Sequence, residues 1–147
     1  MLQTLAISKL TPPFILNWLS YDNDWGGWIV RWRVARNPNT PPETLDRLAN
    51  DEDSSVREGV AYNLNTSPET LDLLANDKKS HVRCMVAQNP NTSPESLERL
   101  ANDECLSVRE FVIHNSNNNN PLKMDILKFL DWIDTASIGD LESLTVS

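Results

Sequence analysis

Short apolar stripes at helical spacing recur along the chain, and no segment shows the alternation that is typical of a β-strand. In one stretch Leu71, Leu74 and Ala75 fall at positions i, i+3 and i+4, which places them on one face of a helix. Ser67 and Pro68 precede this stripe. That order is typical of a helix start, because serine caps free backbone N–H groups and proline needs no N–H partner there. The pattern therefore predicts a helix that begins at Pro68.

A second, short element alternates with these stripes. Over residues 55–62, Val56 and Val60 share one face, and Asn63 ends the segment. Because the element spans only about two turns, α-helical and 3₁₀ geometry are both compatible with it. Each unit is therefore expected to hold two helices, the second of them short.

The two-element unit repeats at intervals of 26 residues. A Val-Arg pair marks each copy, at Val30-Arg31, Val56-Arg57, Val82-Arg83 and Val108-Arg109. The segments 40–51, 66–77 and 92–103 also match closely, as TPPETLDRLAND, TSPETLDLLAND and TSPESLERLAND. One such unit cannot bury its apolar stripes alone, but stacked copies bury them against each other. The sequence therefore predicts an all-α fold, an α-solenoid.

The copies define one helical-repeat domain over residues 1–132. It comprises a degenerate N-terminal copy at 11–36, repeats at about 37–62, 63–88 and 89–114, and a degenerate C-terminal copy at 115–132. Degenerate outer copies suit the two ends of a stack, because an end unit faces water on one side. Residues 133–147 form a C-terminal tail outside the pattern.

The segment from Met124 to Ile133 is apolar on more than one side. A terminal cap should be polar outward, so this segment is expected to have apolar surface still to be covered. Two alternatives follow: the tail folds back over Trp132, or the surface is an interface with another copy or a larger assembly.

The repeated pattern V-R-x-x-V-A-x-N-P-x-T-x-P-E-x-L-x-x-L-A-x-D resembles the leucine-rich repeat variant, which is loosely related to HEAT repeats. The resemblance covers about residues 11–132. It implies a right-handed superhelix of alternating α- and 3₁₀-helices that serves as a binding scaffold. The family's founding member also carries a cysteine-rich segment with an iron–sulfur cluster, which has no counterpart in this chain. We therefore expect the fold without the cluster, and no cofactor.

Charge and composition narrow the class of protein. Among 147 residues, 13 are Lys or Arg and 21 are Asp or Glu, for a formal net charge of −8. That balance disfavours a protein that binds nucleic-acid backbones. The first 40 residues run the other way, with four basic and two acidic side chains. No apolar run reaches the roughly 18 residues of a membrane span, and no basic stretch of a signal peptide precedes the first apolar residues. A cytoplasmic protein without a membrane segment is the expectation.

Arginine and aspartate recur in register with the repeat. The arginines flank the apolar face of the second element, at Arg31, Arg57, Arg83 and Arg109. Aspartates stand six residues before the last three of them, at Asp51, Asp77 and Asp103. Because a partly buried charge needs a partner, we interpret these residues as a structural arginine ladder that joins the repeats. The alternative, a row of arginines that binds phosphates, is disfavoured by the repeated acids.

Positions that vary between the copies are free to serve a ligand. Four i, i+4 pairs occupy such positions on the second elements, and we name these eight residues the outer strip: Trp32, Arg36, Glu58, Tyr62, Cys84, Gln88, Glu110 and His114. One interpretation is unconstrained drift at solvated positions. The other, favoured by the large side chains, is a strip that binds a partner.

Few residues suggest chemistry. Cys84 and Cys105 are interpreted as exposed substitutions, and neither His81 nor His114 has a second histidine at metal-ligand spacing. No catalytic grouping and no metal site is predicted. Four of the five tryptophans lie in the first 32 residues, where they either close the open end of the solenoid or form an aromatic site for a partner.

Three functions were weighed on these grounds. The first is a non-catalytic scaffold or adaptor that binds another protein, whose identity the sequence does not give, as a subunit of a larger complex or alone. The second is a HEAT-like repeat protein that binds nucleic acid, for which Arg31, Arg33 and Arg36 speak. The third is an enzyme, for which no residue set argues. The sequence therefore favours the protein-binding scaffold.

Overall fold

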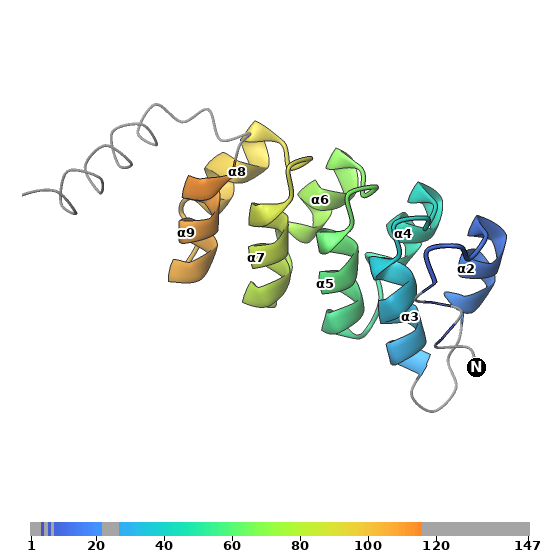
Figure 1. The fold of residues 1–147 in the computed structure, drawn as a ribbon. Helices are drawn as coiled ribbons and strands as arrows, with labels where there is room; N and C mark the ends of the chain where they lie inside the picture. Colours follow the sequence, from blue (N-terminus) through green and yellow to red (C-terminus); the bar gives the residue numbers. More distant parts are fainter. Residues whose placement is uncertain (1–3, 5, 7, 22–26, 116–147) are drawn as a thin grey trace, which may run out of the picture.

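The computed structural model of the chain describes residues 4, 6, 8–21 and 27–115. Every element in this part is an α-helix (Figure 1). The helices are α2 (Pro13–Leu19), α3 (Gly27–Arg36), α4 (Pro42–Leu48), α5 (Ser54–Tyr62), α6 (Pro68–Leu74), α7 (Ser80–Gln88), α8 (Pro94–Leu100) and α9 (Leu106–His114). The all-helical solenoid predicted from the repeat is confirmed.

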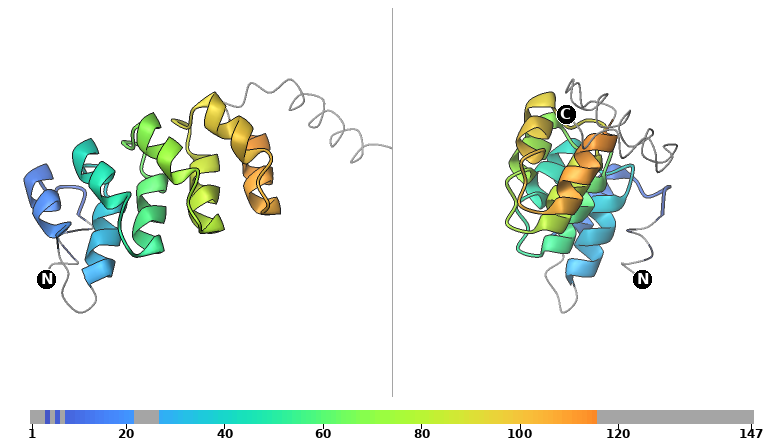
Figure 2. Two further views of the ribbon diagram at one scale, coloured as in Figure 1. Left: turned by 180° about the vertical axis from the view of Figure 1, so that it is seen from behind. Right: turned by 90° about the vertical axis from the view of Figure 1, so that its left-hand side faces the viewer.

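The helices form two rows. Helices α3, α5, α7 and α9 pack side by side along the stack, and α2, α4, α6 and α8 form the row beside them (Figures 1 and 2). Each unit therefore contributes its first helix to one face of the solenoid and its second helix to the other.

The relative lengths of the two helices correct one expectation. The first helices have seven residues, whereas the second helices have nine or ten and are α-helical. Tighter bonding, from an N–H to the carbonyl three residues back, occurs just after the first helix, as in Asn76 N to Leu73 O at 3.2 Å and Asp77 N to Leu74 O at 3.0 Å. The sequence pattern did not reveal this, because apolar spacing alone does not separate a helix from its last turn.

The start of a first helix follows the sequence closely. The Ser67 side chain accepts a hydrogen bond from the backbone N–H of Thr70, and Pro68 is the first helical residue. Leu71 and Leu74 are buried, as their shared face requires. The equivalent leucines and the valines of the second helices join one continuous core that runs through the stack. Each layer is therefore held by its neighbours rather than by a core of its own.

Some predictions fall on the other residues of the chain. The C-terminal copy after Asn115, the tail at 133–147 and its two alternatives lie outside the described residues. They stay predictions. Within the described part, no helix is long and apolar enough to cross a membrane.

Candidate functional site

The arginine ladder joins each repeat to the next. The Nε atom of each arginine donates to an aspartate Oδ2 at 2.6 Å, and its Nη2 donates to Oδ1 at 2.9–3.1 Å. The pairs are Arg31–Asp51, Arg57–Asp77 and Arg83–Asp103. In each pair both side chains are more than nine-tenths buried. Two parallel, charge-assisted bonds in a buried place fix the relative position of adjacent layers.

The ladder's connectivity differs from what the sequence spacing suggested. The carboxylate that pairs with Arg57 stands 20 residues after it, in the next repeat. The aspartate six residues before it, Asp51, offers its backbone carbonyl to Arg57 Nη1 at 2.8 Å. Arg83 and Arg109 bond the carbonyls of Asp77 and Asp103 in the same way, at 2.7 and 2.5 Å.

Charge is stabilised on both sides of the ladder. The hydrogen bond with Asp103 raises the pKa of Arg83 against the effect of burial. The same bond from Arg83 lowers the pKa of Asp103, aided by the Cys105 backbone N–H. Burial raises the pKa of Asp77, but the bonds from Arg57 and the Lys79 N–H outweigh it, so this pKa is also lowered. Both partners of these two pairs are therefore ionised at neutral pH.

A second ladder, of asparagines, was missed as an interaction at the sequence stage of reasoning from helix ends. Asn89 is buried, and its Nδ2 donates to Ala61 O at 2.7 Å and Asn63 O at 3.0 Å in the preceding repeat. Its Oδ1 accepts from the Asn91 backbone N–H at 2.9 Å. Equivalent bonds are made by Asn37, Asn63 and Asn115. The signal was present, because an asparagine recurs in register in every copy.

The outer strip lies on the row of second helices, with unequal exposure. Tyr62 is 51% exposed. Gln88, Glu110 and His114 are also exposed, and Trp32, Arg36 and Glu58 are half-buried. Cys84 is not on the surface, since only 8% of it is exposed. The expectation of an exposed cysteine is wrong there, because Cys84 packs into the core and lies near Cys105. Burial, with the nearby Cys105, raises the pKa of the Cys84 thiol.

The structure brings three strip residues together. The guanidinium carbon of Arg36 lies 4.0 Å from the centroid of the Tyr62 ring and 5.4 Å from that of Trp32. Gly59 permits this approach of α3 and α5: a Cβ at Gly59 would lie 3.0 Å from the Ala35 Cβ and 3.3 Å from the Arg36 Cγ. The absence of a side chain at one position of α5 therefore helps to seat an arginine between two aromatic rings.

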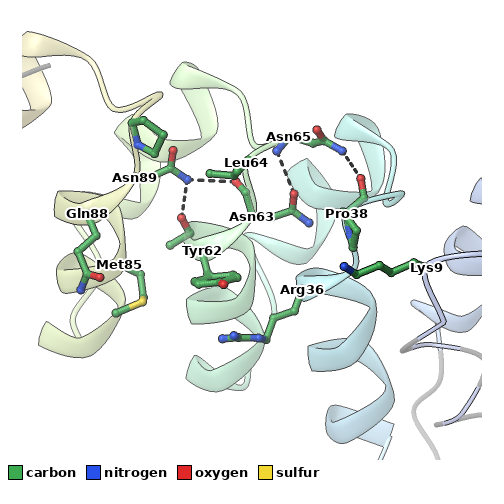
Figure 3. A pocket seen from close by; sticks show the side chains of 12 residues that line it. Lys9, Arg36, Pro38, Tyr62, Asn63, Leu64, Asn65, Met85, Gln88 and Asn89 are labelled. Carbon is green, nitrogen blue, oxygen red and sulfur yellow. Dashed lines mark hydrogen bonds between the residues drawn. The ribbon is translucent and has the colours of Figure 1, made fainter. Parts of the chain in front are cut away.

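A pocket of about 440 Å³ opens beside this stack, where α3, α5 and α7 end. Figure 3 shows Lys9 reaching toward Pro38 from one side and Met85 and Gln88 standing on the other, with Tyr62 between them. The lining residues are Lys9, Arg36, Pro38, Ala61, Tyr62, Asn63, Leu64, Asn65, Met85, Gln88, Asn89 and Pro90. Of these, the outer strip included Arg36, Tyr62 and Gln88.

The rest of the pocket was missed because it comes from loops and from Lys9, which lie outside the helix positions compared between copies. Two strip residues, Glu110 and His114, are on α9 and do not line it. Trp18 is 63% exposed on α2, so this tryptophan does not close the end of the stack. Within the described residues, no group of three or more His, Cys, Asp or Glu side chains could hold a metal ion.

Comparison with known proteins identifies the repeat. The family model for the leucine rich repeat variant matches residues 28–53 and 81–104. These segments contain the ladder pairs Arg31–Asp51 and Arg83–Asp103. Neither the curated proteins nor the solved structures compared with the chain give a match.

Proposed function

We propose that this chain, which carries leucine rich repeat variant repeats, is a non-catalytic scaffold that binds another protein through the outer strip. The observation that supports this is a division of labour within each repeat. Register-fixed side chains such as Arg57 and Asn63 are buried and bonded to neighbouring layers. Variable positions such as Tyr62, Gln88 and His114 are exposed along one row of helices.

Aromatic and apolar side chains on this face support a protein partner. Trp28, Tyr62, Leu106 and Phe111 belong to the second helices and are exposed. Exposed side chains of this kind, and aromatic ones above all, are those that contribute most to protein interfaces. The partner's identity, and the cytoplasmic location expected from the sequence, stay predictions.

Nucleic-acid binding is the weaker alternative. Of the three arginines that favour it, Arg31 is paired in a buried bond with Asp51. That leaves Arg33 and Arg36, with Lys9 nearby, against a formal net charge of −8. Salt-dependent retention on heparin or DNA columns separates this alternative from the scaffold.

A capture experiment with two matched variants tests the scaffold. The strip variant carries Tyr62→Ala, Gln88→Ala and His114→Ala. The control carries Glu69→Ala, Leu73→Ala and Glu95→Ala, which are exposed positions on the first helices. We expect proteins captured by the unaltered chain from a native lysate, identified by mass spectrometry, to be retained by the control and lost by the strip variant. Equal capture by both variants, with unchanged melting, would reject the strip as the binding face.

A further inference from the structure

The pocket beside α5 is a basic place on an acidic protein. It is lined by Lys9 and Arg36 and by no Asp or Glu side chain, although the chain has a formal net charge of −8. Its neighbours on the strip do not supply the missing acid. The Glu58 carboxylate lies 4.0 Å from His81 Nε2, and no ion pair between Glu58 and Arg36 is present. The pocket is therefore complementary to a negatively charged group.

Arg36 is held in a conformation that leaves its hydrogen-bonding edge available. Its guanidinium stacks on the Tyr62 ring and lies beside the Trp32 ring, and stacking engages the flat face of the group rather than its N–H groups. Among the described residues, no carboxylate forms an ion pair with it. Because the side chain is already ordered, a carboxylate that binds there pays little for ordering it.

The remaining walls are mostly apolar. Leu64, which is 65% exposed, and Met85 face the pocket, and Pro38 and Pro90 complete its rim. A volume of about 440 Å³ is within the range of sites that hold an organic ligand. Walls of this kind accept a bulky apolar side chain, with methionine adapting to its shape. The pocket thus combines an apolar hollow with two cations beside it.

We propose that this pocket binds an extended acidic peptide segment of the partner protein. An apolar side chain of the peptide enters the hollow between Leu64 and Met85. Flanking Asp or Glu carboxylates pair with Arg36 and Lys9, and the Gln88 amide offers a neutral hydrogen-bonding group at the edge. This inference rests on the proposed scaffold function and specifies the chemistry of its partner.

A peptide is favoured over a single-stranded nucleic acid by the same contacts. Binding of single strands relies on aromatic faces open to stacking bases and on a basic groove that follows many phosphates. Here Arg36 already stacks on the Tyr62 ring, and the pocket offers two cations. Two cations suit two carboxylates on a short peptide better than a continuous row of phosphates.

Fluorescence anisotropy with the full chain and labelled nine-residue peptides tests the proposal. The peptides carry Leu, Phe or Met at the centre, flanked on both sides by Glu, by Gln or by Lys. We expect the Glu-flanked peptides to bind at least about tenfold more tightly than the Gln-flanked ones, because charge-assisted bonds are the stronger kind. The Lys-flanked peptides should not bind, and added salt should weaken the Glu-flanked ones.

Two arginine variants give a matched comparison. Arg36→Gln should reduce the affinity for Glu-flanked peptides to that for Gln-flanked ones. Arg47→Gln is the control: Arg47 also stacks on a tyrosine, with its guanidinium carbon 3.8 Å from the Tyr21 ring centroid, but it lies outside the pocket. This control should leave peptide binding unchanged. Thermal melting of both variants checks that the fold is kept.

Several outcomes would overturn the proposal: no binding of Glu-flanked peptides at millimolar concentration, equal binding of Gln-flanked peptides, or full affinity in Arg36→Gln. An oligothymidine probe that binds more tightly than any peptide, and depends on Arg36, would assign the pocket to nucleic acid instead. If the peptides fail while partner capture still depends on Tyr62, Gln88 and His114, the scaffold stands and only this inference falls. Capture that is unaffected by the strip variant rejects the scaffold itself.

Discussion

Arg31 and Arg36 lie five positions apart on α3 and have opposite surroundings. Arg31 is buried, and both of its bonding edges meet Asp51 of the next unit at 2.6 and 3.0 Å. Arg36 is half-buried and stacked on Tyr62, and no described carboxylate pairs with it. The same side chain thus joins layers where an acid stands opposite, and is available for recognition where an aromatic ring stands there instead.

The largest effect is expected from breaking one rung of the arginine ladder. Arg57→Met leaves the Asp77 carboxylate buried without its partner and should lower the free energy of unfolding by about 3–5 kcal/mol. Urea unfolding followed by circular dichroism measures it.

Arg99→Met supplies the matched control for this rung. Arg99 also pairs with an aspartate of the neighbouring unit, Asp72, at 2.9 Å, but the two side chains are 43% and 52% exposed. An exposed pair is worth about 0–1 kcal/mol, so this variant should unfold almost like the unaltered chain. Equal losses in the two variants would contradict the importance of burial.

The asparagine ladder is expected to contribute somewhat less. Asn89→Ala removes two donors from the Ala61 and Asn63 carbonyls and one acceptor from the Asn91 N–H. Leaving buried backbone groups unbonded should cost about 2–4 kcal/mol in all. Asn91→Ala is the control, since Asn91 is exposed and its Nδ2 bonds only the Leu64 carbonyl at 2.7 Å. It should cost less than about 1 kcal/mol. If the two variants melt alike, the buried ladder is not a main source of stability.

Acid should weaken the ladder and leave the Arg36 stack intact. The pKa values of Asp77 and Asp103 are lowered in the folded chain from an ordinary value of 3.8. A lowered folded-state pKa gives stability that is present above the ordinary value and is lost as the pH falls through the folded one. Unfolding free energy measured between pH 6 and pH 2 should therefore decline below about pH 4. Asp103→Asn should decline less steeply, and an identical slope would contradict the assignment.

The repeat was predictable from the sequence because it is written in register, and the stacked helices follow from it. The partner of each ladder arginine was not. Asp51 stands six residues before Arg57 and 20 after Arg31, and these separations add up to one repeat period of 26 residues. A perfectly periodic pattern therefore contains both pairings, and only the packing of adjacent layers distinguishes them.

The site was predictable in part for a related reason. Tyr62 and Gln88 occupy positions that differ between copies, and the structure exposes both. Lys9 and Leu64 reach the pocket from segments that lie between helices, so a comparison of helix positions does not find them. The burial of Cys84 depends on the neighbouring unit and on Cys105, which apolar spacing within one helix does not encode.

The most direct test measures stability and peptide binding together in Arg57→Met and Arg36→Gln. We predict opposite results. Arg57→Met should lose about 3–5 kcal/mol of unfolding free energy and, below its melting temperature, still bind Glu-flanked peptide with unchanged affinity. Arg36→Gln should lose less than about 1 kcal/mol and bind that peptide no better than the Gln-flanked one. A destabilised Arg36→Gln that keeps its affinity, beside a stable Arg57→Met that loses it, would contradict the division between the ladder and the strip.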